Sequence, residues 1–251
     1  MVAAAKLLRH AGRKRAGLFL AEGPNLVEAA LRRGVVGDVY ATVAACDRFA
    51  ELLASAPVHV VTDKAAKALS DTVTPVGLVA VCRMPDDSLQ DVLATSPRLV
   101  LVAVETSEPG NAGTLIRIAD AMGADAVVLA GESVDPFNGK CLRASAGSIF
   151  ALPVLSAPEV SALVTTLRTA GLRVLATTLD GEAALDDPEV EAGLTAPTAW
   201  LFGAEAHGLA EDVAALADAR VRIPMPGSAE SLNIAAAAAI CLYQSARAQR
   251  A

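Results

Sequence analysis

Three short polar segments in the second half of the chain each follow an aliphatic run with the pattern of a buried β-strand. They span residues 105–117, 201–209 and 224–233. Their amide, carboxylate, hydroxyl and guanidinium groups can bind a polar ligand. In open α/β sheets, ligands bind at the loops that follow the carboxyl ends of the strands. The three segments are therefore the candidate ligand site of this protein.

The side chains in these segments that could do chemistry also have ordinary structural roles. Asn111 can cap a helix that begins directly after it, and Ser231 and Asn233 are candidate caps for the alanine-rich run that follows them. Arg117 falls on the polar side of the first expected helix. Glu205 stands between two glycines, which let the backbone approach a ligand closely. Taken alone, these residues fit either a ligand site or a set of helix caps.

Several common cofactor and metal signatures are missing from the sequence. It contains no GxxxxGK[ST] run and no GxGxxG run after a strand, so neither a P-loop nor an ordinary dinucleotide site is supported. With three histidines, no HExxH motif and no CxxC pair, we expect no metal. The four cysteines lie far apart, and we expect them to be buried thiols: Cys46, Cys82, Cys141 and Cys241.

The elements that would position the polar segments form an α/β pattern from residue 98 to the end of the chain. Continuous aliphatic runs, typical of parallel strands covered on both faces, lie at 99–104, 126–129, 172–176, 199–202 and 221–223. Helices are expected between them, at 114–122, 159–169, 209–217 and 234–248. Alternation of strand and helix predicts an open, mostly parallel sheet with helices on both faces over residues 98–251.

The first 84 residues predict a smaller α/β module. Strands are expected at 17–21, 35–43, 58–61 and 77–82, and helices at 3–16, 24–33, 47–54 and 64–69. Residues 85–97 are polar and bounded by prolines, which makes them the predicted linker between the two domains. The chain holds 53% hydrophobic but only 3% aromatic residues, so both cores should be aliphatic.

The distribution of charge and hydropathy along the sequence limits the kinds of partner that the protein can bind. No apolar run is long enough to span a bilayer and the N-terminus lacks a signal-peptide pattern, so we expect a cytoplasmic protein. The net charge is −7, but residues 1–34 hold seven cations and two acids and are therefore +5, which leaves −12 for the remainder. This basic end is either a solvated helix face or a contact surface for RNA or phosphate. Its cations are Lys6, Arg9, Arg13, Lys14, Arg15, Arg32 and Arg33.

Together and in this order, the three polar segments resemble the motifs of the SpoU (TrmH-type) family of RNA ribose methyltransferases in the SPOUT superfamily. The similar stretches are Asn-Ala-Gly-Thr-Leu-Ile-Arg-Ile-Ala-Asp-Ala-Met-Gly-Ala at 111–124, Leu-Phe-Gly-Ala-Glu-Ala-His-Gly-Leu at 201–209, and Ile-Pro-Met at 223–225 with Ser-Leu-Asn at 231–233. The stretch that begins at Arg143 is also family-like. Residues 19–30 and 76–81 look like the small substrate-binding module of the rRNA-modifying and thiopeptide-resistance branches.

The resemblance implies transfer of a methyl group from S-adenosylmethionine to a ribose 2′-hydroxyl by a homodimer whose C-terminal segment threads a trefoil knot. The residues that match the family's cofactor positions are Gly203, Ile223 and Leu232. Those that match its reaction centre are Asn111, Arg117, Glu205, Ser231 and Asn233. The family assigns activation of the hydroxyl to the arginine. Because a guanidinium with a pKa above about 12 is a poor base, we expect Arg117 to position the substrate and favour the developing alkoxide.

The substrate implied by the resemblance is RNA, and the N-terminal module favours 23S rRNA. The residues expected to contact it are Arg9, Arg13, Lys14, Arg15 and Arg143. A tRNA 2′-O-methyltransferase and a non-catalytic RNA-binding protein with the same fold are the alternatives within this fold. A nicotinamide-dependent oxidoreductase is a third class, and the missing glycine fingerprint argues against it.

Overall fold

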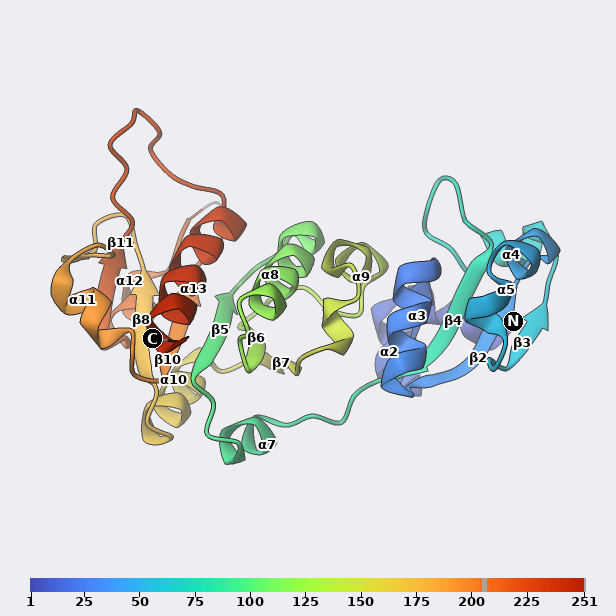
Figure 1. Cartoon of the computed structure of the whole chain (residues 1–251), viewed down its shortest axis with the longest axis horizontal. Helices are drawn as coiled ribbons and strands as arrows, with labels where there is room; N and C mark the ends of the chain where they lie inside the picture. Colours follow the sequence, from blue (N-terminus) through green and yellow to red (C-terminus); the bar gives the residue numbers. More distant parts are fainter. Residues whose placement is uncertain (205–206, 251) are drawn as a thin grey trace. The chain divides into compact units, whose positions relative to one another are not determined.

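The computed structural model describes residues 1–204 and 207–250, and its internal contacts divide the chain into two compact units. Unit 1 comprises Met1–Asp86 together with Asp135–Ala151, and unit 2 comprises Asp87–Val134 together with Leu152–Ala251 (Figure 1). The segment 135–151 was expected within the C-terminal domain. It belongs to unit 1 because its aromatic side chains pack there: the Phe19 ring lies 4.7 Å from that of Phe137 and 6.0 Å from that of Phe150, centroid to centroid.

Unit 1 is built on a four-stranded mixed sheet with the order β1-β4-β2-β3. The central strand β4 is antiparallel to both of its neighbours, and β3 runs parallel to β2 at one edge. The strands are β1 (Leu18–Glu22), β2 (Val36–Ala41), β3 (Val58–Val60) and β4 (Leu78–Arg83). All four lie where aliphatic runs predicted them, and the buried core on one face is the aliphatic cluster that includes Leu7, Leu20 and Val79.

The helices of unit 1 are short, and two differ from the predicted ones. They are α1 (Val2–Ala5), the 3₁₀ turn η1 (Lys6–Leu8), α2 (His10–Ala16), α3 (Pro24–Arg33), α4 (Val43–Arg48), α5 (Ala50–Leu53), α6 (Asp63–Lys67), α9 (Gly139–Ser145) and the 3₁₀ turn η2 (Ser148–Phe150). The single basic helix predicted at 3–16 is broken, because Arg9 adopts an extended backbone with φ −103° and ψ 140°. The helix predicted at 47–54 is two shorter helices, and Thr42 caps the first through the Ala45 amide.

A buried ion pair attaches segment 135–151 to the N-terminal helices of unit 1. The Arg13 side chain is only 4% exposed, and its Nε and Nη2 donate to Asp135 Oδ2 over 2.8 and 2.6 Å. Its Nη1 donates to the carbonyls of Leu7 and Leu8. Desolvation raises the pKa of the Asp135 carboxyl, but hydrogen bonds from His10 and Arg13 outweigh it, so the net shift is downward.

Unit 2 contains a seven-stranded sheet with the order β7-β6-β5-β10-β8-β11-β9, and every pairing in it is parallel. The strands are β5 (Leu99–Val104), β6 (Ala126–Ala130), β7 (Val154–Ala157), β8 (Arg173–Thr177), β9 (Ala183–Ala184), β10 (Thr198–Phe202) and β11 (Ala219–Arg222). The predicted parallel α/β sheet is confirmed. The sequence analysis missed β7 and β9, because four- and two-residue edge strands carry little aliphatic pattern.

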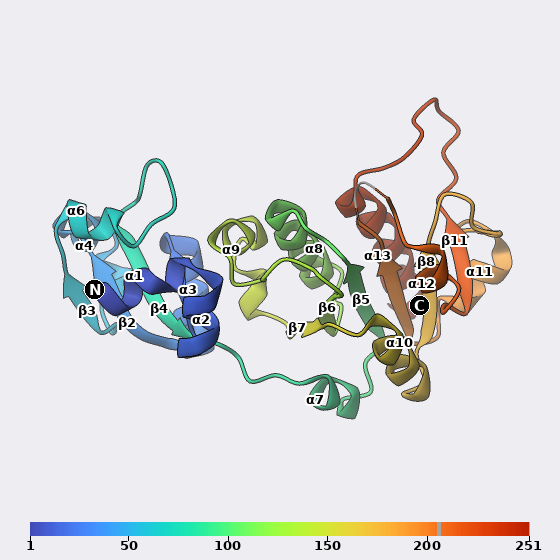
Figure 2. The same ribbon diagram turned by 180° about the vertical axis from the view of Figure 1, so that it is seen from behind.

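Helices cover both faces of this sheet (Figure 1, and from behind in Figure 2). The helices are α7 (Leu89–Ala94), α8 (Pro109–Ala121), α10 (Val160–Thr169), α11 (Pro188–Gly193), α12 (Glu211–Ala214) and α13 (Ile234–Arg250). On one face α7, α10 and α12 pack against alternate strand residues such as Val100 and Val102. On the other, α13 contacts both α8 and β10, and the Trp200 indole donates to the Ser245 hydroxyl over 2.9 Å.

Two features of unit 2 depart from the expected pattern. Helix α8 begins at Pro109, five residues before the predicted start, because proline is suited to the first helical position and Glu108 caps it through the Gly110 amide. The predicted linker 85–97 contains α7, whose Ser88–Asp91 capping box and buried Val92 hold it against the core of unit 2. Among the described helices, none is long and apolar enough to cross a membrane.

The Arg13 ion pair generates a stability prediction. Arg13→Gln should lower the free energy of unfolding by about 3–5 kcal/mol at neutral pH, because it leaves the Asp135 carboxylate buried without its main partner. Since the folded pKa of Asp135 is depressed, this stabilisation is present above the unfolded pKa of about 4 and is lost as the pH falls through the folded pKa. Urea unfolding of the whole chain at pH 7 and pH 3 measures both effects.

A matched control is Arg15→Gln, which removes an exposed cation from the same helix. This change should alter the free energy of unfolding by less than about 0.5 kcal/mol. Equal losses in the two variants at pH 7 would contradict the structural role of Arg13.

Candidate active site

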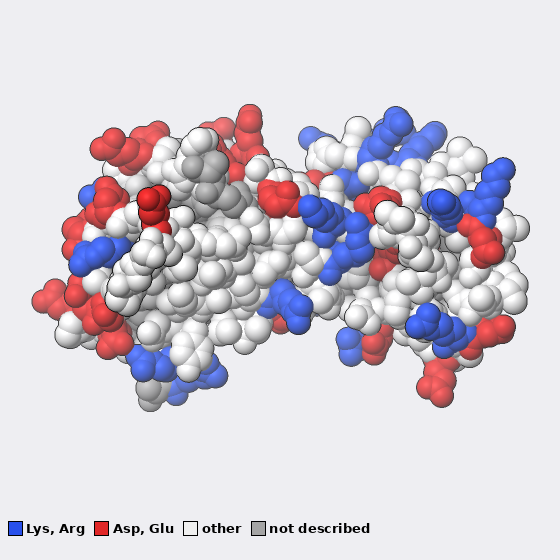
Figure 3. Space-filling view, turned by 90° about the horizontal axis from the view of Figure 1, so that it is seen from above, with Lys and Arg blue, Asp and Glu red and all other residues white. Residues whose placement is uncertain are grey.

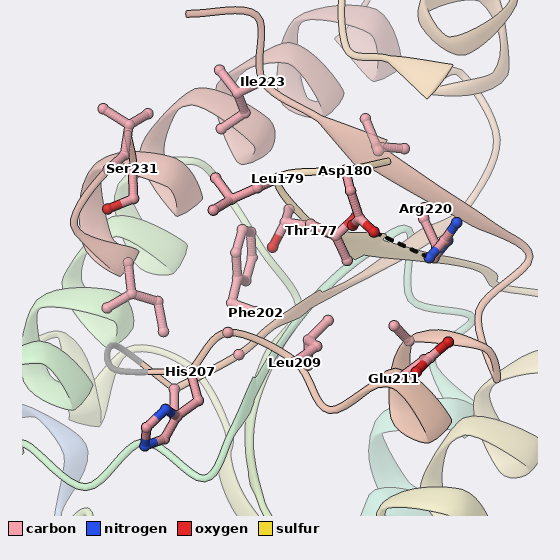
Figure 4. Close-up of a pocket in the computed structure, with 18 of the residues that line it drawn as sticks. Thr177, Leu179, Asp180, Phe202, His207, Leu209, Glu211, Arg220, Ile223 and Ser231 are labelled. Carbon is pink, nitrogen blue, oxygen red and sulfur yellow. Dashed lines mark ion pairs between the residues drawn. The ribbon is translucent and has the colours of Figure 1, made fainter. Parts of the chain in front are cut away.

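A cavity of about 630 Å³ lies in unit 2 beyond the carboxyl ends of β8, β10 and β11 (Figure 4). The residues that directly follow these strands line it, including Thr178 after β8, Gly203 after β10 and Ile223 after β11. This is the edge at which the sequence predicted a ligand, and the volume falls in the range of small-molecule sites, about 300–1,000 Å³. The cavity is therefore the candidate binding site for a cofactor.

All three residues predicted to hold the cofactor line this cavity. Gly203, Ile223 and Leu232 come from three separate segments, and Ser231 joins them from the predicted reaction centre. Leu232 remains 37% exposed, so its side chain is available for contact with a ligand. A sheet edge thus brings together residues that lie up to 29 positions apart in the chain.

The glycine at 203 is required by the loop that follows it. A Cβ at this position would collide with the backbone of Gly208 and Leu209, because the loop folds back on itself. The Gly208 amide donates to the Ala204 carbonyl over 2.8 Å and closes this turn. Glu205, the predicted reaction-centre carboxylate, lies outside the described residues.

Two of the predicted reaction-centre amides lie together at the starts of α8 and α13. The Asn233 Nδ2 donates to Asn111 Oδ1 over 3.4 Å, and the Asn233 Oδ1 accepts from the Ala235 amide over 2.9 Å. Asn233 therefore caps α13, as its position before the alanine run predicted. The prediction that Asn111 caps a helix was wrong, because α8 has already begun at Pro109 and Asn111 lies within its first turn.

Arg117 lies farther along α8, with an exposed side chain. Within residues 1–204 and 207–250 it forms no ion pair, and neither Arg117 nor the two asparagines line the cavity. It lies six positions after Asn111, which places the two on different sides of the helix at about 100° per residue. In a single chain, Asn111 and Asn233 lie together and the residues predicted to bind the cofactor line one cavity, whereas Arg117 does not line that cavity and lies on another side of α8 from Asn111.

Sequence reasoning missed the residues after β8 and one on β11. Thr177, Thr178, Leu179 and Asp180 line the cavity, as does Arg220. A signal was available for residues 177–180, since they follow the strand predicted at 172–176 at the edge where ligands bind, but Arg220 precedes the strand predicted at 221–223 and had no such signal. In Figure 4 the Asp180 and Arg220 charges lie on one side of the cavity, away from Ser231 on the other side.

The charges at this end of the cavity form a short network. Arg220 Nη1 lies 3.7 Å from Asp180 Oδ2, and its Nε donates to Glu182 Oε2 over 2.9 Å. The pKa of the exposed Glu182 carboxyl is lowered, chiefly by hydrogen bonds from its own backbone amide and from the Arg220 backbone amide. The cavity thus has a charged end and, around Leu179, Ile223 and Leu232, apolar walls.

The composition of the cavity suits a nucleoside with a charged tail. Its apolar side chains can contact a planar base, and its charges can face an amino-acid group. The hydroxyl oxygen of Thr178, a lining residue, is closed to solvent and has no hydrogen-bond partner among the described residues. In these respects the residues present fit S-adenosylmethionine, the cofactor that the sequence motifs imply.

The four cysteines are free, and three of them are buried as expected. Burial raises the pKa of Cys82 and of Cys141 to about 12 and raises that of Cys241 as well, whereas Cys46 is only half-buried, so the prediction was wrong for this residue. In the part of the chain that the structure describes, no three or more His, Cys, Asp or Glu residues are grouped so that they could hold a metal ion.

The predicted RNA-binding cations have different environments in unit 1. Arg9, Lys14 and Arg15 are exposed. Arg13 is not available to RNA, because it is buried in its ion pair with Asp135. Arg143 is half-buried, pairs with Asp71 and lies 3.8 Å from a Glu22 carboxylate oxygen, so it is largely engaged within the protein.

Charge is divided unequally between the two units. Unit 1 holds 13 Lys and Arg against 9 Asp and Glu, a net +4, while unit 2 holds 8 against 19, a net −11. In Figure 3, clusters of Lys and Arg side chains mark the surface of unit 1, and acidic side chains border a broad uncharged surface on unit 2. A polyanion would therefore meet favourable charge on unit 1.

Family models match both parts of the chain. The SpoU rRNA Methylase family model matches residues 98–243, and the MRM3-like substrate binding domain model matches residues 3–80. A relative from Bacillus subtilis, named 23S rRNA (guanosine(2553)-2′-O)-methyltransferase RlmP, is 36% identical over 92% of this chain and 89% of its own length.

Solved structures of SpoU and rRNA methyltransferases are also similar to this chain. The SpoU methyltransferase AviRb from Streptomyces viridochromogenes, in complex with AdoMet, superimposes with a TM-score of 0.83 at 32% identity, over 99% of this chain and 96% of that one. An AdoMet-bound rRNA methyltransferase from Sinorhizobium meliloti does so with a TM-score of 0.82 at 29% identity, over 98% and 93%. With the motif residues, the parallel sheet and these matches in agreement, the chain belongs to the SpoU rRNA methylase family.

Proposed function

We propose that this protein transfers a methyl group from S-adenosylmethionine to a ribose 2′-hydroxyl of 23S ribosomal RNA in the cytoplasm. The observation that carries the proposal is the 630 Å³ cavity that Gly203, Ile223 and Leu232 line together at the end of the parallel sheet. Two relatives of known structure are described as AdoMet-bound, and the relative from Bacillus subtilis is named for 2′-O-methylation of 23S rRNA. These names support the same cofactor and substrate class for this chain.

The cavity residues bind and orient the cofactor. Ile223 and Leu232 supply apolar contacts, and the tight turn that Gly203 permits exposes backbone groups at the end of β10. When bound, the cofactor supplies an electrophilic methyl carbon on a positively charged sulfur. The protein's contribution at this stage would be proximity, since the cavity residues would hold the cofactor for the attacking oxygen.

The reaction centre acts on the ribose. Asn111 and Asn233, already in contact, are placed to hold ribose hydroxyls, with Ser231 and Glu205 as further members of the centre. Held by Gly203, Ile223 and Leu232, the cofactor would supply the methyl group that replaces the proton of the 2′-hydroxyl, which would leave to solvent. Arg117 stabilises the negative charge on the attacking oxygen and the neighbouring phosphate, an electrostatic role that a permanently protonated guanidinium can fill.

A homodimer and a trefoil knot complete the proposed architecture. Helix α13 leaves Ile240 38% exposed and Tyr243 53% exposed on a face with small alanines, a surface suited to a second copy. Because Arg117 lies six positions after Asn111, on another side of α8, an interface between copies is where we propose that it meets a reaction centre. The knot rests on family membership, in which the chain beyond β11 passes through a loop before α13.

The RNA is expected to bind mainly through unit 1. Its net +4 contrasts with −11 for unit 2, and the exposed cations at its start are Lys6, Arg9, Lys14 and Arg15. With 3% aromatic residues, the chain has few rings for base stacking, so phosphate contacts should dominate affinity.

Two substitutions separate catalysis from cofactor binding. Arg117→Ala should cut methyl transfer to rRNA about 100- to 1,000-fold, the loss expected for removing one group that stabilises developing charge, while S-adenosylmethionine affinity stays within a few fold. Leu232→Ala should instead weaken the cofactor about 5- to 30-fold by removing buried apolar contact. Transfer of labelled methyl groups and calorimetric titration measure the two quantities.

The controls use ligands and a surface leucine. S-adenosylmethionine should raise the melting temperature of the wild-type protein, NAD should not, and Leu8→Ala, at a similarly exposed position in unit 1, should bind the cofactor normally. A shift with NAD and none with S-adenosylmethionine would sink the proposed function. Normal turnover in Arg117→Ala would remove Arg117 from the centre.

The dimer is tested by mass in solution. Sedimentation equilibrium at micromolar concentration should give twice the 25.5 kDa of one chain. Tyr243→Glu should shift the equilibrium toward monomer, because it places a charge on the apolar face of α13. A wild-type protein that sediments only at 25.5 kDa would contradict the proposal.

The salt dependence of RNA binding tests the role of unit 1. Each phosphate neutralised on a single strand contributes about 0.7 to the slope of log affinity against log salt, so replacing Lys6, Arg9, Lys14 and Arg15 by glutamine should flatten it by at most about 2.8. Arg13 is left unchanged because it is buried.

The matched control for this experiment removes cations from unit 2. Replacing the exposed Arg168 and Arg222 by glutamine should leave the slope unchanged. If the fourfold variant in unit 1 keeps the wild-type slope and affinity, those cations form a solvated helix face and the assignment of the RNA surface is wrong.

A further inference from the structure

Two helices of unit 1, α2 and α3, end next to the last residue of β4. Each has cations in its last turn, and each is followed by a glycine in the left-handed conformation, which ends the helix. The exposed cations of these two turns and of the strand end gather at one end of the sheet of unit 1. We call them the arginine cluster: Lys14, Arg15, Arg32, Arg33 and Arg83.

Hydrogen bonds from two consecutive residues hold the two helix ends together. The Arg83 amide donates to the Val35 carbonyl over 2.9 Å, and the Arg83 Nη2 donates to the Gly34 carbonyl, at the end of α3, over 2.8 Å. The next amide, that of Met84, donates to the Gly17 carbonyl at the end of α2 over 2.9 Å. The basic last turns of α2 and α3 are therefore brought to the same end of the sheet.

Most of these cations have no counter-charge. Among the described residues, Arg32 is the one member of the cluster that forms an ion pair, with Glu28 at 3.6 Å and one turn earlier on α3. The Arg83 guanidinium is bonded to a carbonyl, which does not neutralise its charge. Cations in the last turn of a helix stabilise the helix through its dipole. Exposed cations that gather without acids also raise the local positive potential, which attracts a polyanion.

The segments that form the cluster hold no neutral polar side chain that reads a base. Residues 14–18, 31–37 and 82–85 contain no acid and no Asn, Gln, Ser or Thr. Contacts to base edges specify a sequence, whereas contacts from Arg and Lys to phosphate oxygens position a nucleic acid of any sequence. A guanidinium binds a phosphate through two parallel hydrogen bonds. The composition of the cluster therefore fits the sugar-phosphate backbone rather than the bases.

Unit 1 also offers no exposed aromatic ring of Phe, Tyr or Trp for base stacking. It lies wholly within the described residues, and none of its Phe and Tyr side chains is exposed: Phe19, Tyr40, Phe49, Phe137 and Phe150. Proteins that hold single strands without sequence preference stack the bases on such rings. Duplex RNA is instead recognised through its phosphates and its shape. Unit 1 is therefore better suited to a duplex than to a single strand.

We propose that the arginine cluster binds the phosphates of a base-paired segment of the RNA substrate, independently of the sequence of that segment. This rests on the proposed function for the substrate class, and it adds the surface that binds and the paired state of the bound RNA. Lys6 and Arg9 precede α2 and are not part of the cluster. Arg32, Arg33 and Arg83 thus gain a role that the charge of the first helices does not give them.

The test measures binding of the whole chain to an RNA duplex of about 16 base pairs, and to one of its single strands, by fluorescence anisotropy at several salt concentrations. The wild-type protein should bind the duplex more tightly. Replacing Arg32, Arg33 and Arg83 by glutamine removes up to three phosphate contacts. At about 0.9 per contact, the value for duplex DNA, this variant should flatten the slope of log affinity against log salt by at most about 2.7.

A second variant separates charge from structure. Lysine in place of Arg32, Arg33 and Arg83 keeps the three positive charges and should keep most of the wild-type slope. If the arginines served only to stabilise the ends of α2 and α3, the glutamine variant would melt at a lower temperature and keep the wild-type slope. That result would overturn the proposal.

The matched control removes three exposed cations from the opposite end of the same sheet. Arg48 lies on α4, which follows the carboxyl end of β2, and Lys64 and Lys67 lie on α6, which follows that of β3. Replacing these three by glutamine changes the net charge of unit 1 by the same amount and should leave the slope unchanged. Equal flattening in both variants would show that only the total charge matters, and the arginine cluster would not be the binding surface.

Two further results have distinct meanings. A wild-type protein that binds the single strand as tightly as the duplex would overturn the paired state of the bound RNA and with it the proposal. A wild-type protein that neither binds S-adenosylmethionine nor transfers its methyl group would instead overturn the proposed function. The glutamine variant of the cluster should bind S-adenosylmethionine with wild-type affinity, because no member of the cluster lines the cofactor cavity.

Discussion

The candidate site depends on how the central strand β10 is held. It pairs in parallel with β5 and with β8, and it is buried on both faces. The Trp200 indole, fully enclosed, donates to the Ser245 hydroxyl and so fixes α13 to the strand. The strand's end places Gly203, and the start of α13 places Asn233. A shift between strand and helix would therefore separate the cavity from the asparagine pair, and the buried hydrogen bond opposes such a shift.

Much of this arrangement could be predicted from the sequence, because parallel strands covered on both faces leave long aliphatic runs. The runs at 99–104 and 199–202 marked β5 and β10, and the polar residues after them marked the sheet edge. The prediction that failed concerned the residue at which a helix begins. Asn111 looked like a cap because it precedes a helical pattern, yet Pro109 starts the helix earlier. A helical pattern in the sequence does not determine the residue at which the helix begins.

The packing of residues far apart in the chain could not be predicted from the sequence, for a different reason. Arg13 counts as a cation in any inspection of composition, and only its partner reveals that it is structural. Asp135 is 122 residues away, in a segment that interrupts the pattern of unit 2 and packs into unit 1. An ion pair between residues so far apart leaves no periodic pattern in the sequence. The charge count of the N-terminus remains informative, since six of its seven cations are exposed, and unit 1 is positive while unit 2 is strongly acidic.

The chemistry of the proposed reaction follows from what the described site can and cannot supply. Three of the cysteines are buried thiols with raised pKa values, so they are protonated at neutral pH and out of reach of a ribose. A sulfonium releases a neutral thioether, which is an excellent leaving group. The protein therefore needs to align the attacking oxygen and stabilise the charge on that oxygen rather than supply a strong base. An arginine fits that need because it keeps its charge throughout. Arg117 is exposed and lies six positions after Asn111 on α8, and for this reason the proposed homodimer puts the complete centre between two copies of the chain.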